Sequence, residues 1–233
     1  MQTATYIERR SQLESYFDRT AVDAWARLTS DAPVSRIRAT VRAGRNRMRE
    51  TLLSWLPQDL HGARLLDAGC GTGALSIEAA KRGANVVAID VAPTLIRLAQ
   101  ERTPADLGNG QIDFRSGDML DPALGDFDFV VAMDSLIHYR ASDCVDAIAN
   151  LSARTGGSIL FTFAPRTPAL AAMHAIGRLF PRKERAPSIQ PVSQNDLLER
   201  LGNEAALNAW SVIRTQRIVN GFYTSQAVEL RKQ

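Results

Sequence analysis

The feature that most constrains the fold is an alternation of short apolar runs and helical segments that begins near residue 64. Five short runs that contain valine, isoleucine, leucine or phenylalanine are expected to be strands: 64–68, 85–90, 111–118, 126–134 and 157–165. Strands that alternate with helices are typical of a parallel sheet built from βαβ units. The sequence therefore predicts an α/β fold with a Rossmann-like, mostly parallel sheet.

The two ends of the chain break this rhythm. Residues 1–60 carry arginines on one helical stripe and apolar residues on another, which predicts a helical N-terminal arm or lid. Residues 61–233 are interpreted as the main domain, with a helical insertion at 166–192. Near the C-terminus, Asn220-Gly221 separates two β-rich runs and is a strong hairpin signal. The last strand is therefore expected to run antiparallel to its neighbours.

Composition and charge exclude several classes of protein. The chain has 233 residues, 45% of them hydrophobic, which fits one domain with an appendage. Its net charge of +3 is too small to require a nucleic-acid partner. Cys70 and Cys144 have neither disulfide nor zinc-site spacing, so no protein-bound metal is expected. The N-terminus lacks the apolar core of a signal peptide, and no run approaches the roughly 20 apolar residues of a membrane span. These features predict a soluble or peripheral, cytoplasmic protein.

The run LLDAGCGTGALS at 65–76 is expected to form a strand, a glycine turn and the start of a helix. Gly69 and Gly71, with Cys70 between them, would let the backbone approach a ligand closely. The glycines alone fit NAD as well as S-adenosylmethionine. Asp67 separates the two, because a carboxylate at this position would repel a pyrophosphate but attract the ammonium and sulfonium groups of S-adenosylmethionine. We therefore expect S-adenosylmethionine as co-substrate.

Two further acids follow the next two strands. Asp90 lies 21 residues after Gly69, where a ribose-binding acid belongs, and is followed by Val91. Asp118 is placed to accept a hydrogen bond from the adenine amine, with Met119 against the adenine ring. Any one of these acids could merely cap a helix or a turn. Three acids at successive strand ends, together with the glycine loop, favour a cofactor site.

The fourth strand ends in the polar run MDSLIHY at 133–139. Ligands of open α/β sheets bind beyond the carboxyl ends of the strands, so this run is expected to face the transferred methyl group. Met133 and Asp134 should lie along the cofactor, while His138 and Tyr139 should reach the methyl acceptor. A single histidine more often has a structural role. Its position at this strand end favours a functional one here.

Residues 60–165 resemble the class I S-adenosylmethionine-dependent methyltransferases. The resemblance rests on the order of three motifs: the acid-x-Gly-x-Gly-x-Gly loop, the acid after it and the later Gly-Asp-Met. That resemblance implies a seven-stranded sheet with an antiparallel last strand. Nearly the whole chain resembles the magnesium-protoporphyrin IX O-methyltransferase family of chlorophyll and bacteriochlorophyll synthesis. The resemblance is carried by the runs YFDRTAVDAWARL, MDSLIHY, FTFAPRTPAL and GFYTSQAVELR. The chain departs from the family pattern at Asp18 and Arg45, where many relatives carry asparagine and histidine. Those two positions receive no predicted role.

The family resemblance implies that one propionate of Mg-protoporphyrin IX receives a methyl group and becomes a methyl ester. A propionate has a pKa of ~4.5 by analogy with glutamate and is already ionised at neutral pH, so no general base is required. Tyr16 of the arm and His138 of the sheet are expected to position it as catalytic residues. Four arginines, Arg36, Arg38, Arg42 and Arg166, are candidates for binding propionates, and Arg38 and Arg166 are preferred. The apolar face of a predicted helix at 167–180 could line a slot for the macrocycle.

The resemblance also suggests contacts with the porphyrin-binding subunit of magnesium chelatase and peripheral contact with a photosynthetic membrane. Two other interpretations stay open. A methyltransferase for RNA or another small molecule could use the same fold, with the arginine-rich arm contacting phosphates, although no aromatic platform for stacked bases is evident. A cofactor-binding protein without enzymatic activity could instead use the arm to dock a partner. We expect no nucleic-acid partner.

Overall fold

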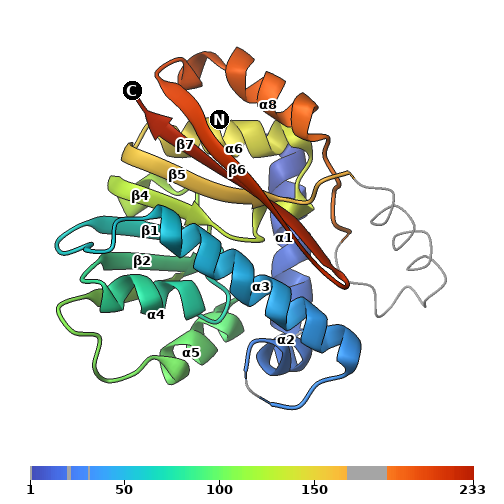
Figure 1. The fold of residues 1–233 in the computed structure, drawn as a ribbon, viewed down its shortest axis with the longest axis vertical. Coiled ribbons are helices and arrows are strands. Elements are labelled where there is room, and N and C mark those ends of the chain that lie inside the picture. Colours follow the sequence, from blue (N-terminus) through green and yellow to red (C-terminus); the bar gives the residue numbers. More distant parts are fainter. Residues whose placement is uncertain (1, 20–21, 31, 167–187) are drawn as a thin grey trace.

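A computed structural model describes residues 2–19, 22–30, 32–166 and 188–233 of the chain (Figure 1). The described part contains seven strands, which are β1 (Arg64–Ala68), β2 (Asn85–Asp90), β3 (Gln111–Ser116), β4 (Phe127–Ala132), β5 (Thr155–Phe163), β6 (Trp210–Asn220) and β7 (Tyr223–Lys232). Its α-helices are α1 (Ala4–Arg19), α2 (Val22–Leu28), α3 (Arg36–Trp55), α4 (Ala74–Lys81), α5 (Pro93–Arg102), α6 (Ala141–Ser152) and α8 (Gln194–Asn203). Short 3₁₀ turns lie at Pro122–Leu124, Leu136–His138 and Ala205–Leu207.

The strands form one sheet in the order β3-β2-β1-β4-β5-β7-β6. β1 to β5 pair in parallel, whereas β7 runs antiparallel to both β5 and β6. The prediction of a mostly parallel sheet closed by an antiparallel strand is therefore confirmed. The predicted hairpin is also present, because β6 ends at Asn220, Gly221 adopts a left-handed φ of 57°, and β7 begins at Tyr223.

Helices cover both faces of the sheet, and the alternation of side chains along the strands explains why. Leu65 and Val86 join the core cluster that contains α3 and α4, while their neighbours Leu66 and Val87 join the cluster that contains α1, α6 and α8. Successive side chains of a strand point to opposite faces, so a strand that is apolar throughout needs a helical layer on each side. This requirement accounts for the two layers visible in Figure 1.

The N-terminal helices pack into these same cores. Tyr6 and Leu13 of α1 are 3% and 4% exposed, and Met48 and Leu52 of α3 are fully buried. The helical character predicted for the arm is confirmed, whereas the domain boundary near residue 60 stays a prediction. The insertion helix predicted at 167–180 lies outside the described residues.

The order of the strands reverses between β1 and β4, because the chain moves outward through β2 and β3 and then returns to the other side of β1. At such a reversal the connections leave in opposite directions and open a crevice beyond the carboxyl ends of the strands. The glycine loop follows β1 and the MDSLIHY run follows β4, so the fold brings both to this crevice.

Candidate active site

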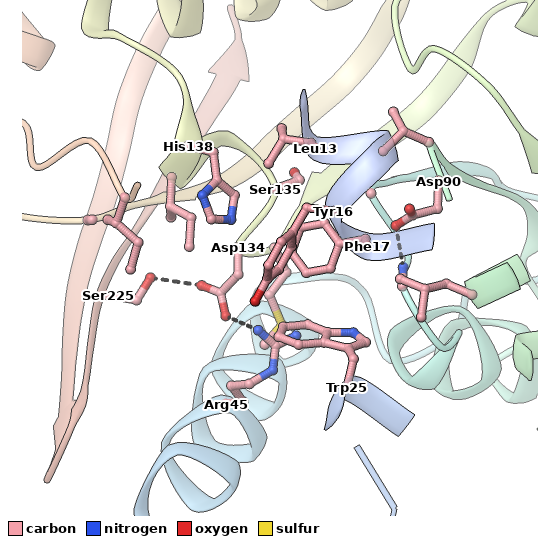
Figure 2. Close-up of a pocket in the computed structure, with 18 of the residues that line it drawn as sticks. Leu13, Tyr16, Phe17, Trp25, Arg45, Asp90, Asp134, Ser135, His138 and Ser225 are labelled. Atoms are coloured by element: carbon pink, nitrogen blue, oxygen red, sulfur yellow. Dashed lines mark hydrogen bonds and ion pairs between the residues drawn. The ribbon is translucent and has the colours of Figure 1, made fainter. Parts of the chain in front are cut away.

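A cavity of about 470 Å³ lies in the crevice beyond β1, β2 and β4 (Figure 2). A smaller cavity of about 230 Å³ lies on the other side of the glycine loop. Six residues line both cavities and mark their junction: Trp25, Leu28, Arg45, Gly69, Gly71 and Met133. The wall is built partly by the sheet and partly by helices α1, α2 and α3, which supply Tyr16, Phe17, Trp25 and Arg45.

The glycine loop lies between the two cavities and lines both of them. Gly69 has a left-handed φ of 86°, and a Cβ atom at this position would collide with the Cβ of Ser135. The amides of Gly69 and Cys70 both donate to the carbonyl of Ile89, which ties the loop to β2. Only glycine therefore lets the loop pass this close to the end of β4. Cys70 is buried, and burial raises the pKa of its thiol, so Cys70 stays a neutral wall residue of the smaller cavity.

Asp67 lines the smaller cavity and is 1% exposed. The Ser76 hydroxyl donates to its carboxylate at 2.6 Å. Burial raises the pKa of Asp67 to about 7, more than the hydrogen bond from Ser76 lowers it. Ionised Asp67 would thus gain from a nearby cation, in keeping with its predicted contact with a ligand ammonium.

Asp90 lies on the wall of the main cavity, together with Val91. One carboxylate oxygen accepts a hydrogen bond from the Gly71 amide at 2.9 Å, a contact drawn in Figure 2, and the other accepts from the Ala92 amide at 3.0 Å. Burial raises the pKa of Asp90, while these two amides lower it. The two amides fix the direction of the carboxylate and leave lone pairs for a ligand hydroxyl.

Asp118 is held by the arm. Its Oδ1 accepts from the Tyr6 hydroxyl at 2.8 Å, and its Oδ2 accepts from Gln2 at 2.7 Å and from Arg10 at 2.5 Å. Met119, the next residue, lines the main cavity, whereas Asp118 is not among the described lining residues. The predicted contact of Asp118 with an adenine amine therefore stays a prediction. In the structure Asp118 anchors α1.

The MDSLIHY run turns sharply after β4. Asp134 is the one residue other than glycine in the described chain with a positive φ, 53°. His138 is 9% exposed, lines the main cavity, and meets the ring of Phe17 edge-on with the centroids 6.0 Å apart. Figure 2 shows its imidazole on the same side of the cavity as Asp134. The structure thus brings His138 and Met133 to the main cavity, while their predicted contacts with the acceptor and the cofactor stay predictions.

Tyr139 also lines the cavity, but its ring stacks on Tyr6 of α1 with the centroids 4.9 Å apart. Tyr139 is 3% exposed, and burial raises the pKa of its phenol. Tyr16 faces the cavity from α1, where burial likewise raises the pKa of the phenol. Both phenols are therefore neutral hydrogen-bond donors at neutral pH.

The arginines predicted to bind propionates lie in different places, and the guanidinium of Arg42 donates to backbone carbonyls of residues 27, 28 and 32. Arg38 lines the main cavity near the start of α3. Arg166 is exposed and is not among the described lining residues, and its backbone amide pairs with the carbonyl of Val192. The structure therefore brings Arg38 to the site, but it does not bring Arg166 there.

Asp134 is the centre of a polar network that the sequence did not reveal. Its carboxylate accepts from Arg45 at 2.7 Å, from the Tyr223 hydroxyl at 3.0 Å, from Ser225 at 3.0 Å and from Thr162 at 3.2 Å. The Asp134 side chain is 3% exposed. The partners come from α3, β5 and β7, so the network joins the end of β4 to the C-terminal hairpin. The sequence predicts Asp134 along the cofactor from an acid directly after a buried strand, and that contact stays a prediction; the protein partners of its carboxylate had no sequence signal.

Comparison with known proteins decides the family. Residues 132–232 match the model of the magnesium-protoporphyrin IX methyltransferase C-terminus, and residues 65–155 match a methyltransferase domain. The chain is 49% identical to the magnesium-protoporphyrin O-methyltransferase of Rhodobacter capsulatus, over 97% of this chain and 98% of that protein. The chain belongs to the magnesium-protoporphyrin O-methyltransferase family.

Other members of the magnesium-protoporphyrin O-methyltransferase family agree with this assignment. The enzyme of Synechocystis sp. is 30% identical over 97% of this chain and 98% of its own length. The crystal structure of magnesium protoporphyrin IX methyltransferase from Synechocystis PCC 6803 with bound SAH (S-adenosylhomocysteine) superposes with a TM-score of 0.83 at 29% identity, covering 96% of this chain and all of that one. The co-substrate of this family of transferases is S-adenosylmethionine (SAM), as expected from Asp67 beside the glycine loop.

Two findings bear on metals and membranes. Among the described residues, no cluster of three or more His, Cys, Asp and Glu side chains is arranged to hold a metal ion. None of the described helices combines the length and apolarity that a membrane crossing requires. Within the magnesium-protoporphyrin O-methyltransferase family, the metal of the name belongs to the porphyrin.

Proposed function

We propose that this protein transfers a methyl group from S-adenosylmethionine to one propionate carboxylate of Mg-protoporphyrin IX and forms the monomethyl ester in (bacterio)chlorophyll synthesis. The supporting observation is the end-to-end similarity to the Rhodobacter capsulatus enzyme combined with a cavity that joins a glycine loop to an apolar chamber. The chamber walls include Leu13, Phe17, Ile137 and Phe222. A flat macrocycle with apolar faces suits such walls.

The reaction is an in-line displacement at the sulfonium methyl carbon. A carboxylate oxygen forms the new bond to carbon, the bond between sulfur and carbon breaks, and its electron pair stays on sulfur to give S-adenosylhomocysteine. No proton moves, because the propionate is already ionised. The enzyme therefore contributes alignment of the two reactants and exclusion of water from the carboxylate.

Incubation of the purified protein with S-adenosylmethionine and Mg-protoporphyrin IX tests the proposal. Mass spectrometry should show a product heavier than the porphyrin by one methyl group, and an equal amount of S-adenosylhomocysteine. Protoporphyrin IX dimethyl ester, which has no free carboxylate, should give no product. Methyl transfer to RNA but not to the porphyrin would refute the proposed substrate.

Asp90 is assigned to the two ribose hydroxyls of the co-substrate. Replacing Asp90 with alanine should weaken binding of S-adenosylhomocysteine by about 2–3 kcal/mol, because charged hydrogen bonds are left unmade. Part of this loss comes from the Gly71 amide, which Asp90 also holds. Titration calorimetry measures the change, with Asp113→Ala on the exposed side of β3 as a control. Tight NAD binding by the wild type, or unchanged affinity in Asp90→Ala, would contradict the assignment.

Tyr16 and His138 are assigned to positioning the reacting propionate. Single-turnover rates should be nearly flat across the histidine pKa of ~6.5, because neither residue removes a proton. His138→Asn should keep more activity than His138→Ala, and Tyr16→Phe should lose about tenfold, the ~1.4 kcal/mol of one transition-state hydrogen bond. A rate that rises through pH 6.5 only when His138 is present would indicate base catalysis instead.

Partner contacts are proposed at the rim of the cavity. Ile37, Val219 and Phe222 are 53%, 58% and 48% exposed, and the arginines Arg36 and Arg38 are exposed beside them on α3. Apolar side chains next to cations suit an anionic lipid surface, which supports a cytoplasmic protein that contacts the photosynthetic membrane peripherally. The porphyrin-binding subunit of magnesium chelatase would present its product at the same rim.

The rim proposal predicts binding to vesicles that contain phosphatidylglycerol, loss of that binding at high salt, and weaker binding by Phe222→Ser. Cosedimentation measures the bound fraction, and vesicles of phosphatidylcholine alone serve as the control. Equal binding to both kinds of vesicle would show that the exposed arginines have no part in it.

A further inference from the structure

Arg45 stands at the junction of the two cavities, on the cavity-facing side of α3. Its Nη1 donates to Asp134 at 2.7 Å, and its guanidinium lies over the ring of Trp25, 4.6 Å from the centroid. Figure 2 shows the guanidinium between these two partners. A cation held by a carboxylate on one side and an aromatic face on the other has a fixed direction, so its remaining donors are preorganised.

Among the described residues, those remaining donors have no protein acceptor. Within the described parts of the chain, no acceptor forms a hydrogen bond with Nε or Nη2 of Arg45, and the side chain is 20% exposed. Arg42, one turn earlier, differs because its guanidinium donates to the carbonyls of Arg27, Leu28 and Ala32. Arg42 therefore fixes the α2–α3 connection, whereas Arg45 has donors that no described residue accepts and that a ligand could use.

The contact with Asp134 turns Arg45 toward the main cavity. Asp134 lines the main cavity but not the smaller one, so the end of the Arg45 side chain faces the acceptor chamber. Arg49, one turn later, lines only the smaller cavity and makes no side-chain hydrogen bond or ion pair within the described residues. Arg49 is thus available for the carboxylate at the methionine end of the co-substrate, which leaves Arg45 for the acceptor.

We propose that Arg45 binds a carboxylate of the methyl acceptor and thereby selects acceptors that carry free propionates. This inference rests on the proposed function. A guanidinium is planar and matches a carboxylate with paired donors, and its hydrogen bonds to carboxylate are stronger than neutral ones. In a chamber with mostly apolar walls, an acceptor carboxylate that found no cation would lose its hydration without replacement.

The contact should act on binding more than on the chemical step. As the ester forms, the reacting carboxylate loses its negative charge, so a cation holds it more tightly before the reaction than in the transition state. If the second propionate is the one held, its charge does not change at all. In both cases loss of the contact raises KM more than it lowers kcat.

Comparison of the free diacid with its dimethyl ester isolates the carboxylate contact. Mg-protoporphyrin IX and its dimethyl ester are titrated, by fluorescence, into wild type, Arg45→Gln and Arg47→Gln, the last being an exposed control on the same helix. Wild type and Arg47→Gln should prefer the diacid. Arg45→Gln should bind the diacid about tenfold or more weakly while its affinity for the dimethyl ester stays nearly constant.

Two further variants control for misfolding, which could occur in Arg45→Gln because buried Asp134 is left without its cation. Arg45→Lys keeps the charge but loses the planar donor pair, so its preference for the diacid should be intermediate. Arg45→Gln with Asp134→Asn removes both charges and should lose the preference just as Arg45→Gln does. All variants are checked for native circular dichroism.

The inference fails if folded Arg45→Gln keeps the wild-type preference for the diacid. It also fails if Arg45→Gln weakens S-adenosylhomocysteine binding but leaves that preference unchanged, because Arg45 would then hold the methionine carboxylate. Wild type that neither binds nor methylates Mg-protoporphyrin IX would instead refute the proposed function, so the two failures are distinguishable.

Discussion

Replacement of Asp134 with alanine should lower the free energy of unfolding by about 3–5 kcal/mol, the range found when one partner of a buried ion pair is removed. The Asp134 side chain is 3% exposed, and its loss leaves Arg45 without its carboxylate and the Tyr223 and Ser225 hydroxyls without their acceptor. Alanine would also be strained at a φ of 53°. Urea denaturation measures the change.

Two comparisons show whether this loss comes from the network. Asp134→Asn should be less destabilising, because asparagine tolerates a left-handed φ and still accepts hydrogen bonds. Asp196→Ala, which breaks the half-exposed ion pair with Arg200, should change stability by less than about 1 kcal/mol. Equal stability of Asp134→Ala and wild type would mean that the network around Asp134 contributes nothing to folding.

Deletion of residues 2–19 should reduce methyl transfer by about 100-fold or more. The deletion removes Tyr16 and Phe17 from the cavity wall, so the acceptor is no longer aligned or protected from water. It also takes Tyr6 and Leu13 out of the core, which should lower the midpoint of thermal unfolding. Turnover and thermal unfolding are measured on the same preparation.

Point variants separate these two effects of the arm. Glu8→Ala and Gln12→Ala, at exposed positions of α1, should leave turnover unchanged. Tyr6→Phe removes only the hydroxyl that donates to Asp118 and should weaken docking of α1 while the ring stays on Tyr139. Full turnover by the protein that lacks residues 2–19 would show that α1 has a structural role and no part in the reaction.

Much of the fold follows from the sequence because backbone patterns are local. The alternation of apolar runs and helices required a parallel sheet, and Asn220-Gly221 required a hairpin; both are present. The glycine loop and Asp90 both lie on the wall of the cavity, because a strand end fixes where the next few residues lie. Their predicted contacts with the co-substrate stay predictions.

Side-chain partners across the fold were decided by the tertiary structure. The adenine contact predicted for Asp118 stays a prediction, and the structure adds that its carboxylate is held by Gln2, Tyr6 and Arg10, more than 100 residues earlier in the chain. Tyr139 is predicted to reach the acceptor; it lines the main cavity, and the structure adds that its ring stacks on Tyr6. The sequence shows that a polar group stands at a strand end, but which neighbour satisfies that group depends on how the helices dock.

Arg45 and Asp134 show most clearly the difference between what the sequence predicts and what the tertiary structure decides. The sequence by itself determined that an acid follows β4 and that an arginine-bearing helix precedes the sheet. Their contact joins residues 89 positions apart and depends on the packing of α3 against β6 and β7. No local pattern encodes a contact of that kind, because its geometry follows from the burial of apolar side chains such as Met48 and Leu52, which bring α3 to the sheet.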